Sequence, residues 1–282
     1  MSDTAPASPP EPPEGIAPSL PAEALPDFSQ LNRELALTLE RLLKAWADKI
    51  GPIDQMILDQ LSDLIAHGDI TGLATLVADF AGLTSWLGGS FQELAERSAR
   101  LAQAEARRQG IDLPVGSPAS LALTDIALVS ASTLGAGRVM SVVREAMRLW
   151  PTGRVTPVQR DRIMTGVRDH LASLTTAQPE YVIGGGLIAS IREGRMSTAQ
   201  GQPSAALYGN EILDSRICAN CELVHGKWIG NLDDPNRPWM LTYPVRGYVD
   251  CLGRDRCRGQ IVYVWRGGTD WRKWVEKEPL RS

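Results

Sequence analysis

The chain contains four cysteines, which lie as two pairs near the C-terminus. Their spacing is C-x2-C, then 29 residues, then C-x5-C, formed by Cys218, Cys221, Cys251 and Cys257. A C-x2-C turn lets two sulfur atoms approach one ion, and zinc favours tetrahedral sets of such thiolates. We therefore expect a structural zinc site with these four ligands, and His225 as an alternative fourth ligand. Disulfides formed in an extracellular particle and unlinked thiols remain open as other uses of the four cysteines.

Catalytic use of such a zinc ion finds little support in the neighbouring residues. A catalytic zinc keeps one coordination position open and usually has a Glu or His nearby. Glu222 follows Cys221, but neither H-x-E nor H-E-x-x-H accompanies the cysteines. The remaining histidines, His67 and His170, are not part of a recognisable nucleophile motif. The sequence predicts a protein that is not an enzyme, and the alternative is a zinc-dependent enzyme acting on DNA or nucleotides.

The cysteines lie in a C-terminal module, residues 201–282, that the sequence predicts to be rich in β-structure. Its short aromatic and β-branched runs, such as "GKWIGNL" and "RGQIVYVW", are separated by Gly, Pro, Asn and Asp. An apolar core of this size is often marginal by itself, so a staple is expected. Structural zinc would supply one, because it contributes on the order of 10 kcal/mol to the folding of small peptides.

Two helical regions are predicted before this module, at residues 28–110 and 119–200, joined by a linker at 111–118. Apolar residues recur every three or four positions from Leu31 to Trp46, which indicates one face of a helix. Gly51 and Pro52 predict its end, and a second helix is expected after them. Thr156, Pro157 and Gln159 resemble a capping box that starts a later helix. The predicted fold class is α+β, with a helical N-terminal half followed by a small β-rich module stapled by a four-cysteine zinc site.

Residues 1–27 have the composition of a disordered arm. They hold eight of the nineteen prolines and five acidic residues, and they contain no Lys or Arg. Such a segment has too little apolar surface for its burial to offset the conformational entropy that is lost on ordering. We predict an acidic, partly polyproline-like arm, which either docks on a partner or has no binding role.

Net charge and hydropathy exclude some broad classes of protein. A formal charge of −4 and a pI near 5.5 argue against a general polyanion binder. The opening "MSDTAPASPPEPPEG" lacks the basic and apolar parts of a signal peptide. The stretch "VGSPASLALTDIALVSASTLGAG" is rich in small residues and contains Asp125, so we interpret it as a packing helix rather than a membrane span. We expect a soluble protein that is made in a reducing cytoplasm and has no membrane partner.

The segments "NEILDSRICANCELVHGKWI" and "YPVRGYVDCLGRDRCRGQIVYVW" resemble the C-terminal domain of phage Mu F-like minor head proteins, a family also called head morphogenesis proteins. The resemblance covers about residues 185–268 and is greatest to forms from actinobacterial phages and prophages. It rests on Asp214-x-Arg216-x-Cys218-x-x-Cys221, on Gly226-Lys227 and on Cys257-Arg258, with "IREGRM" upstream. Many relatives carry a His-Pro-x-Cys-Arg-Cys run near the end of the module, where this chain instead has Cys251 as a second-half sulfur.

The resemblance implies a structural role in the virion. Proteins of this family are minor capsid components that associate with the portal vertex and the capsid interior and assist head assembly, DNA packaging or DNA delivery. The implied partners are the portal protein and the major capsid or scaffold proteins. The implied location is the virion, at the capsid interior or portal vertex, with the host cytoplasm as the place of assembly.

Double-stranded DNA, bound without sequence specificity, is a further expected partner. Five arginines flank the second cysteine pair and could contact phosphates without reading bases: Arg246, Arg254, Arg256, Arg258 and Arg266. The alternative is that Arg258 and Arg216 pair internally with Asp214, Asp250 or Asp255.

Overall fold

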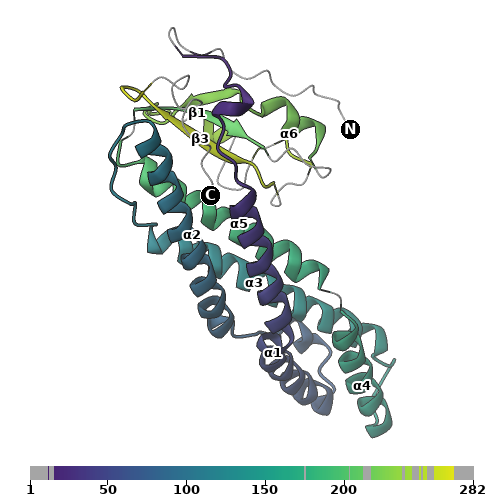
Figure 1. The fold of residues 1–282 in the computed structure, drawn as a ribbon. Helices are drawn as coiled ribbons and strands as arrows, with labels where there is room; N and C mark the ends of the chain where they lie inside the picture. The colour runs from purple at the N-terminus through teal and green to yellow at the C-terminus, as the bar shows by residue number, and fades with distance from the viewer. Residues whose placement is uncertain are drawn as a thin grey trace. The chain divides into compact units, whose positions relative to one another are not determined.

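The computed structural model describes residues 12, 16–174, 176–202, 204–211, 217–236, 239–242, 248, 250–252 and 257–269 (Figure 1). These residues are mostly helical, and a small three-stranded sheet lies in the C-terminal half of the chain. The predicted α+β class is therefore confirmed. The long helices are α1 (Ser29–His67), α2 (Ala81–Arg108), α3 (Ser120–Leu149), α4 (Pro157–Ser173) and α5 (Ala177–Ala199). The sheet region contains β1 (Ala205–Asn210), α6 (Ala219–Val224), β2 (Trp228–Asn231), α7 (Trp239–Thr242) and β3 (Gln260–Trp265). Short 3-10 helices form at Ala22–Ala24 and Thr71–Thr75.

The chain divides into two compact units, each built from separate segments. The sheet unit comprises Met1–Thr38, Gly89–Ile126 and Gly184–Ser282, and the helical unit comprises Leu39–Gly88 and Ala127–Ile183. The unit boundaries fall inside α1, α2, α3 and α5. This division differs from the consecutive regions expected at 28–110, 119–200 and 201–282, because helices that are continuous in sequence contribute residues to both units.

In the helical unit, α1 does not end at Gly51 and Pro52. Pro52 lies inside this helix of 39 residues, so the predicted break is wrong. Proline removes one backbone hydrogen bond and crowds the carbonyl four residues earlier. The apolar stripe nevertheless continues across it, and Ile50, Ile53 and Ile57 are all buried. Burial of this stripe offsets the local cost of the proline.

The predicted start of α4 is confirmed in the same unit. The Thr156 side chain accepts a hydrogen bond from the Gln159 backbone, the Gln159 side chain accepts one from the Thr156 backbone, and Pro157 is the first helical residue. This capping box satisfies amide groups that have no partner within the helix.

The α3 helix is long and apolar enough to cross a membrane by length and composition alone, among the described residues. Its most apolar stretch has a mean hydropathy of 1.5, and 39% of that stretch is buried within the protein. Core helices of soluble proteins meet the same two criteria, so the helix does not assign the chain to a membrane.

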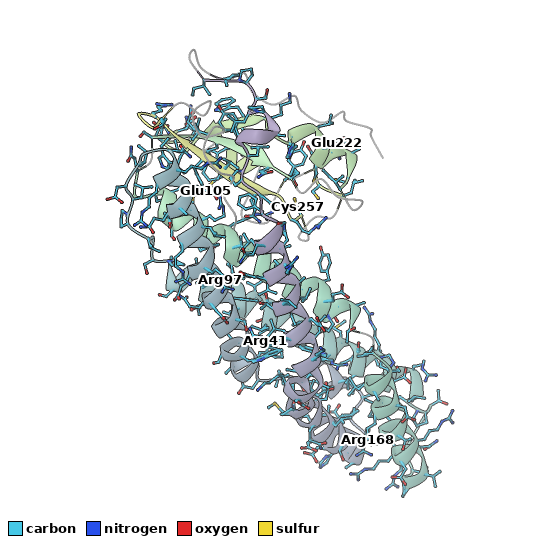
Figure 2. The ribbon with its side chains drawn as sticks, viewed as in Figure 1. Arg41, Arg97, Glu105, Arg168, Glu222 and Cys257 are labelled. Atoms are coloured by element: carbon cyan, nitrogen blue, oxygen red, sulfur yellow. The ribbon has the colours of Figure 1, made fainter. Side chains whose placement is uncertain are left out.

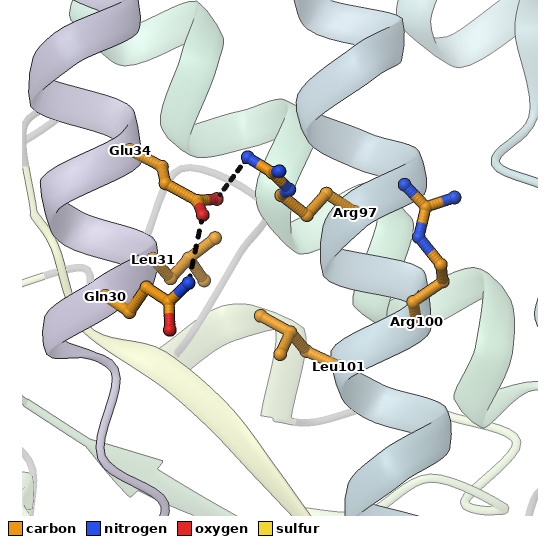
Figure 3. Close-up of a pocket in the computed structure, with 6 residues that line it drawn as sticks. All are labelled: Gln30, Leu31, Glu34, Arg97, Arg100 and Leu101. Carbon is orange, nitrogen blue, oxygen red and sulfur yellow. Dashed lines mark hydrogen bonds and ion pairs between the residues drawn. The ribbon is translucent and has the colours of Figure 1, made fainter. Parts of the chain in front are cut away.

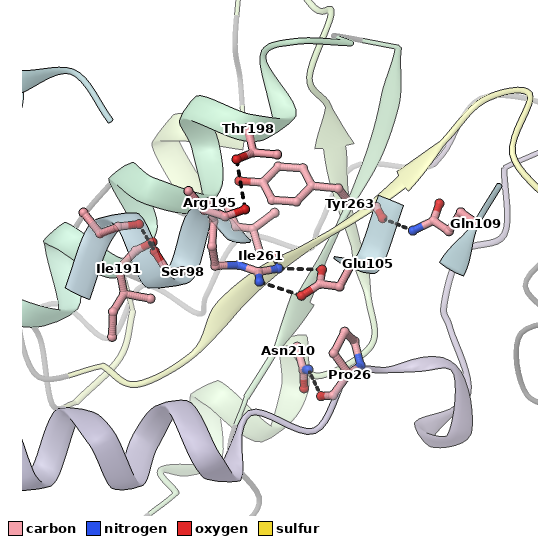
Figure 4. Close-up of polar contacts among 12 residues, drawn as sticks. Pro26, Ser98, Glu105, Gln109, Ile191, Arg195, Thr198, Asn210, Ile261 and Tyr263 are labelled. Atoms are coloured by element: carbon pink, nitrogen blue, oxygen red, sulfur yellow. Dashed lines mark hydrogen bonds and ion pairs between the residues drawn. The ribbon is translucent and has the colours of Figure 1, made fainter. Parts of the chain in front are cut away.

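The sheet has the strand order β2-β1-β3, and both pairings are antiparallel. Within the sheet unit, side chains from α5 and from the residue that follows α2 hold β3, which lies at one edge of the sheet (Figure 4). Gln109, just beyond α2, donates a hydrogen bond to the Tyr263 carbonyl at 2.7 Å and accepts one from the Trp265 amide at 2.9 Å. Arg195 of α5 donates to the Ile261 carbonyl at 2.9 Å. These contacts satisfy backbone groups that an edge strand would otherwise expose.

Residues 16–28, the N-terminal strap, pack against the same sheet. The Leu20 amide donates to the Gly226 carbonyl at 2.8 Å, and the Trp228 amide donates to the Pro18 carbonyl at 3.1 Å. Leu20, Ala24 and Phe28 are buried. The prediction of a disordered arm is therefore wrong for residues 16–27, since this segment gains backbone hydrogen bonds and apolar burial that its composition does not reveal. Residues 1–11 and 13–15 lie outside the described part of the chain.

The predicted linker at 111–118 is irregular but packed. Leu113 is buried, and its carbonyl accepts a hydrogen bond from the Gln103 side chain at 2.7 Å. The Gly116 amide donates to the Thr198 hydroxyl at 2.9 Å. The segment thus contributes to the core of the sheet unit.

Candidate metal centre

The first cysteine pair lies at the start of α6. Cys218 is the N-cap residue of this helix, and its sulfur accepts a hydrogen bond from the Cys221 amide at 3.4 Å. This cap turns both sulfur atoms toward the same side of the short helix, as the C-x2-C spacing predicts. Cys221 is buried and Cys218 is half-buried.

The second pair comes from the chain between α7 and β3. The Cys251 amide donates to the Tyr248 carbonyl at 3.0 Å, and the Asn220 side chain of α6 donates to the Asp250 carbonyl at 2.8 Å. Cys257 lies just before β3 (Figure 2), and its carbonyl accepts a hydrogen bond from Arg192 at 2.7 Å. Each cysteine of this second pair is thus held through its own backbone, by a hydrogen bond that does not involve its sulfur atom.

None of the four cysteines forms a disulfide. Cys221, Cys251 and Cys257 belong to one core cluster with residues of all three strands, and Cys218 packs against that cluster. The four cysteines form a cluster that could bind a metal ion, and the pairs converge on it from segments distant in sequence.

The donor atoms of the cluster form two groups of three that share Cys221. Cys218, Cys221 and Cys251 form one group, and Glu211, Cys221 and Cys257 form the other. Within each group, all ligand atoms lie within 4.8 Å of one another. Glu211 was not predicted from the sequence, and its place directly after β1 is the only local signal that could have drawn attention to it.

His225 does not belong to either group of donors among the described residues. Its Nδ1 instead accepts a hydrogen bond from the Glu211 amide at 3.1 Å. Burial lowers the pKa of His225, which favours the neutral ring that this hydrogen bond requires. The ring of His225 thus contacts the backbone of Glu211 and helps to fix the position of that residue.

Cys221 and Cys257 share one hydrogen bond that sets their protonation. This bond lowers the pKa of Cys257 to about 5, against the effect of burial and with help from the positive charge of Arg192. The same bond raises the pKa of Cys221, which keeps its proton. A thiolate beside a thiol is a suitable starting state for a soft metal ion, which displaces the remaining proton on binding.

The expected phosphate-binding arginines are only partly described. Arg246, Arg254 and Arg256 lie outside the described residues. Arg266 pairs with Asp233 at 3.3 Å, and Arg258 is half-buried and has interactions within the protein. The two described arginines, Arg258 and Arg266, therefore already make contacts within the protein.

A shallow pocket in the sheet unit lies between α1 and α2, apart from the cysteines in sequence (Figure 3). Leu31 and Leu101 line it together with four polar residues, Gln30, Glu34, Arg97 and Arg100. Glu34 pairs with Arg97 across it at 2.9 Å. Exposed arginines and ion pairs that they form with a neighbouring helix are usual on a helix surface, so the pocket does not indicate a ligand.

Comparisons of the chain with protein-family models, with curated proteins and with solved structures each find no match. The resemblance to phage head proteins therefore rests on the residues quoted from the sequence.

Proposed function

We propose that this chain is a minor head protein of a tailed bacteriophage or prophage, of the phage Mu F-like type, and that it acts in particle assembly rather than in catalysis. The observation that carries this proposal is the convergence of Cys218, Cys221, Cys251 and Cys257 on one cluster, at the positions where the sequence resembles the cysteine module of that family. The portal, capsid and scaffold proteins are the proposed partners, and the virion is the proposed location.

Zinc is the ion we propose for this cluster. Thiolates are soft donors that select zinc over magnesium or calcium, and zinc accepts tetrahedral thiolate sets without a redox change. Three of the four cysteines lie in the apolar core of the sheet unit. An ion held there would link α6 to the chain that leads into β3, so its binding free energy would add to the stability of this unit.

Burial also favours a structural ion over a catalytic one. A catalytic zinc needs a position that water and substrate can reach. Cys221, Cys251, Cys257 and Glu211 are each at most 7% exposed. The enzyme alternative, a zinc-dependent enzyme acting on DNA or nucleotides, is therefore less well supported than a structural role.

Double-stranded DNA remains a proposed partner, with weaker support than the capsid proteins. The net charge is negative, and Arg266 already has an acidic partner. Any phosphate contact would then depend on Arg246, Arg254 and Arg256, and would weaken steeply with salt.

The test is incorporation into particles. The chain would be co-expressed with the portal, scaffold and major capsid proteins of its own phage, and particles would be separated on a density gradient and quantified by mass spectrometry. We expect the chain in particles at far fewer copies than the major capsid protein, and we expect Cys221→Ser to abolish incorporation. Glu222→Gln, an exposed change on the same helix, is the control and should incorporate normally. Absence of the wild-type chain from otherwise complete particles would refute the proposal.

A further inference from the structure

The cysteine cluster has more donors than one tetrahedral ion can use. We propose that it holds two divalent ions that share the thiolate of Cys221, and that Glu211 is a ligand of the second ion. This inference rests on the proposed metal-binding role of the cluster and extends it with a second site of mixed thiolate and carboxylate donors.

The grouping of the donors is the first argument. Around a single zinc ion with Zn–S bonds of about 2.3 Å, all four sulfur atoms would lie roughly 3.8 Å from one another. The described donors instead form two groups of three with one common member, Cys221. Cys218 and Cys251 belong with this shared sulfur to one group, and Cys257 and Glu211 belong with it to the other. Each group can provide three corners of a tetrahedron around its own ion.

The second argument is that Glu211 is built into its group. Its side chain is only 4% exposed, and one of its carboxylate oxygens lies 3.7 Å from the Cys257 sulfur. Its backbone amide is fixed by His225 directly after the end of β1. Glu211 therefore differs from surface acids, which lie near a cluster by chance and can turn into solvent.

Charge is the third argument. Four thiolates and one carboxylate would carry five negative charges, and burying that charge is costly unless cations balance it. One divalent ion would leave three of these charges uncompensated, whereas two ions would leave one. Arg192 is 6% exposed and donates to the carbonyls of Cys257 and Gly259, both at 2.7 Å. Its positive charge balances the last negative charge beside the second group.

The two sites should differ in affinity. The group of three sulfurs, from Cys218, Cys221 and Cys251, is the softer and favours zinc more strongly. The group with Glu211 has a harder oxygen donor and a sulfur already shared with the first ion. We therefore expect the ions to bind in two steps, with the Glu211 site filling second.

Metal stoichiometry of the full-length chain tests the proposal. The protein would be purified under reducing conditions with zinc, desalted, and measured by inductively coupled plasma mass spectrometry. We expect two ions per chain in the wild type and one in Glu211→Gln, which keeps the size of the side chain but removes its charge. Glu222→Gln is the matched control, one residue after Cys221 and exposed, and should retain two ions. Cys218→Ser and Cys257→Ser should each retain one ion.

Cobalt(II) replacement tests the shared sulfur directly. Two cobalt ions bridged by one thiolate couple magnetically, so the electron paramagnetic resonance signal should rise with the first equivalent and fall with the second. In Glu211→Gln the signal should rise and then stay constant. One ion per wild-type chain, unchanged by Glu211→Gln, would overturn the two-ion proposal and leave a single structural zinc intact. No bound ion in the wild type would overturn both proposals.

Discussion

The two units of the chain each contain a buried arginine–carboxylate pair, and the two pairs are built differently. In the sheet unit, Arg195 binds both oxygens of Glu105, at 2.6 and 2.8 Å, and both side chains are at most 5% exposed. In the helical unit, Arg138 approaches Asp54 at 3.4 Å, and these side chains are 10% and 17% exposed. The first pair is bidentate and enclosed, whereas the second is a longer contact that retains some access to solvent.

The surroundings of the pairs differ as well. Arg195 also donates to the Ile261 carbonyl of β3 (Figure 4). Its guanidinium lies 4.6 Å from the centre of the Phe28 ring. It therefore joins α2, α5, β3 and the N-terminal strap at one point. Burial raises the pKa of Asp54, and the charge of Arg138 offsets this only in part. We infer that the sheet unit depends on polar and metal-binding anchors, whereas the helical unit depends mainly on apolar packing.

Metal removal should separate the two units most clearly. A chelator that strips the cysteine cluster should destabilise the sheet unit by on the order of 10 kcal/mol, the scale of structural zinc sites in small peptides. Hydrogen exchange followed by mass spectrometry should show faster exchange in β1 and β3 and little change in α4. Equal loss of protection in α4 would contradict the proposed difference between the units.

Glu105→Gln should have the next largest effect. The change leaves the charge of Arg195 buried without its anionic partner, which typically costs about 3–5 kcal/mol. Urea unfolding should report this loss of stability. Glu96→Gln, an exposed change on the same helix, is the control and should alter the free energy of unfolding by about 0.5 kcal/mol or less. Similar costs for both variants would mean that the buried pair does not anchor the sheet unit.

Features that depend on neighbouring residues were predictable from the sequence. The capping box of Thr156 and Gln159 needs only adjacent backbone, and the C-x2-C pair fixes its own turn. The α+β class followed from the change of periodicity near residue 201. Convergence of the second cysteine pair on the first was also expected, because a module of this size needs a staple.

Apart from the convergence of the cysteine pairs, features that depend on long-range contacts were missed. Pro52 is a valid helix-stop signal locally, but packing around it keeps α1 continuous. The N-terminal strap has the composition of a disordered segment, and only the sheet supplies its partners. Glu211 enters the cysteine cluster because β1 ends beside α6, and no spacing rule relates it to Cys257.

Two glycine substitutions test how much the packing of the N-terminal strap contributes to stability. Gly226 has φ +71°, and a Cβ there would lie 2.7 Å from the Leu20 carbonyl oxygen of the strap. Gly68, at the end of α1 in the helical unit, has nearly the same φ of +68° and no atom within 4 Å of such a Cβ. Both changes to alanine incur the left-handed backbone cost of about 1–2 kcal/mol. Gly226→Ala should cost about 1 kcal/mol more, because the strap must shift.

Proteolysis provides the second measurement for this pair. Glu-C should cleave Gly226→Ala within the strap, after Glu23, faster than it cleaves Gly68→Ala or the wild type. Equal rates at this site in both variants would show that the strap is held independently of the Gly226 turn.

Asp54→Asn should have the smallest effect, about 1 kcal/mol or less at neutral pH, because it removes both the attraction to Arg138 and the cost of burying the carboxylate. The pH dependence of the free energy of unfolding shows whether the Asp54 carboxyl group is responsible for this effect. Since the folded-state pKa of Asp54 is raised above its unfolded value of 3.8, the folded protein binds the proton more tightly than the unfolded chain. The stability that Asp54 contributes through this proton is fully present below the unfolded-state pKa and is lost as the pH rises through the folded-state pKa.

The wild type should therefore gain stability relative to Asp54→Asn as the pH falls from neutral through the folded pKa of Asp54. Urea unfolding of both proteins between about pH 4 and 7 would measure this difference. A cost at neutral pH as large as that of Glu105→Gln would show that the two buried pairs are equivalent anchors. The contrast between the sheet unit and the helical unit would then have to rest on the metal centre alone, since the arginine–carboxylate pairs would no longer distinguish them.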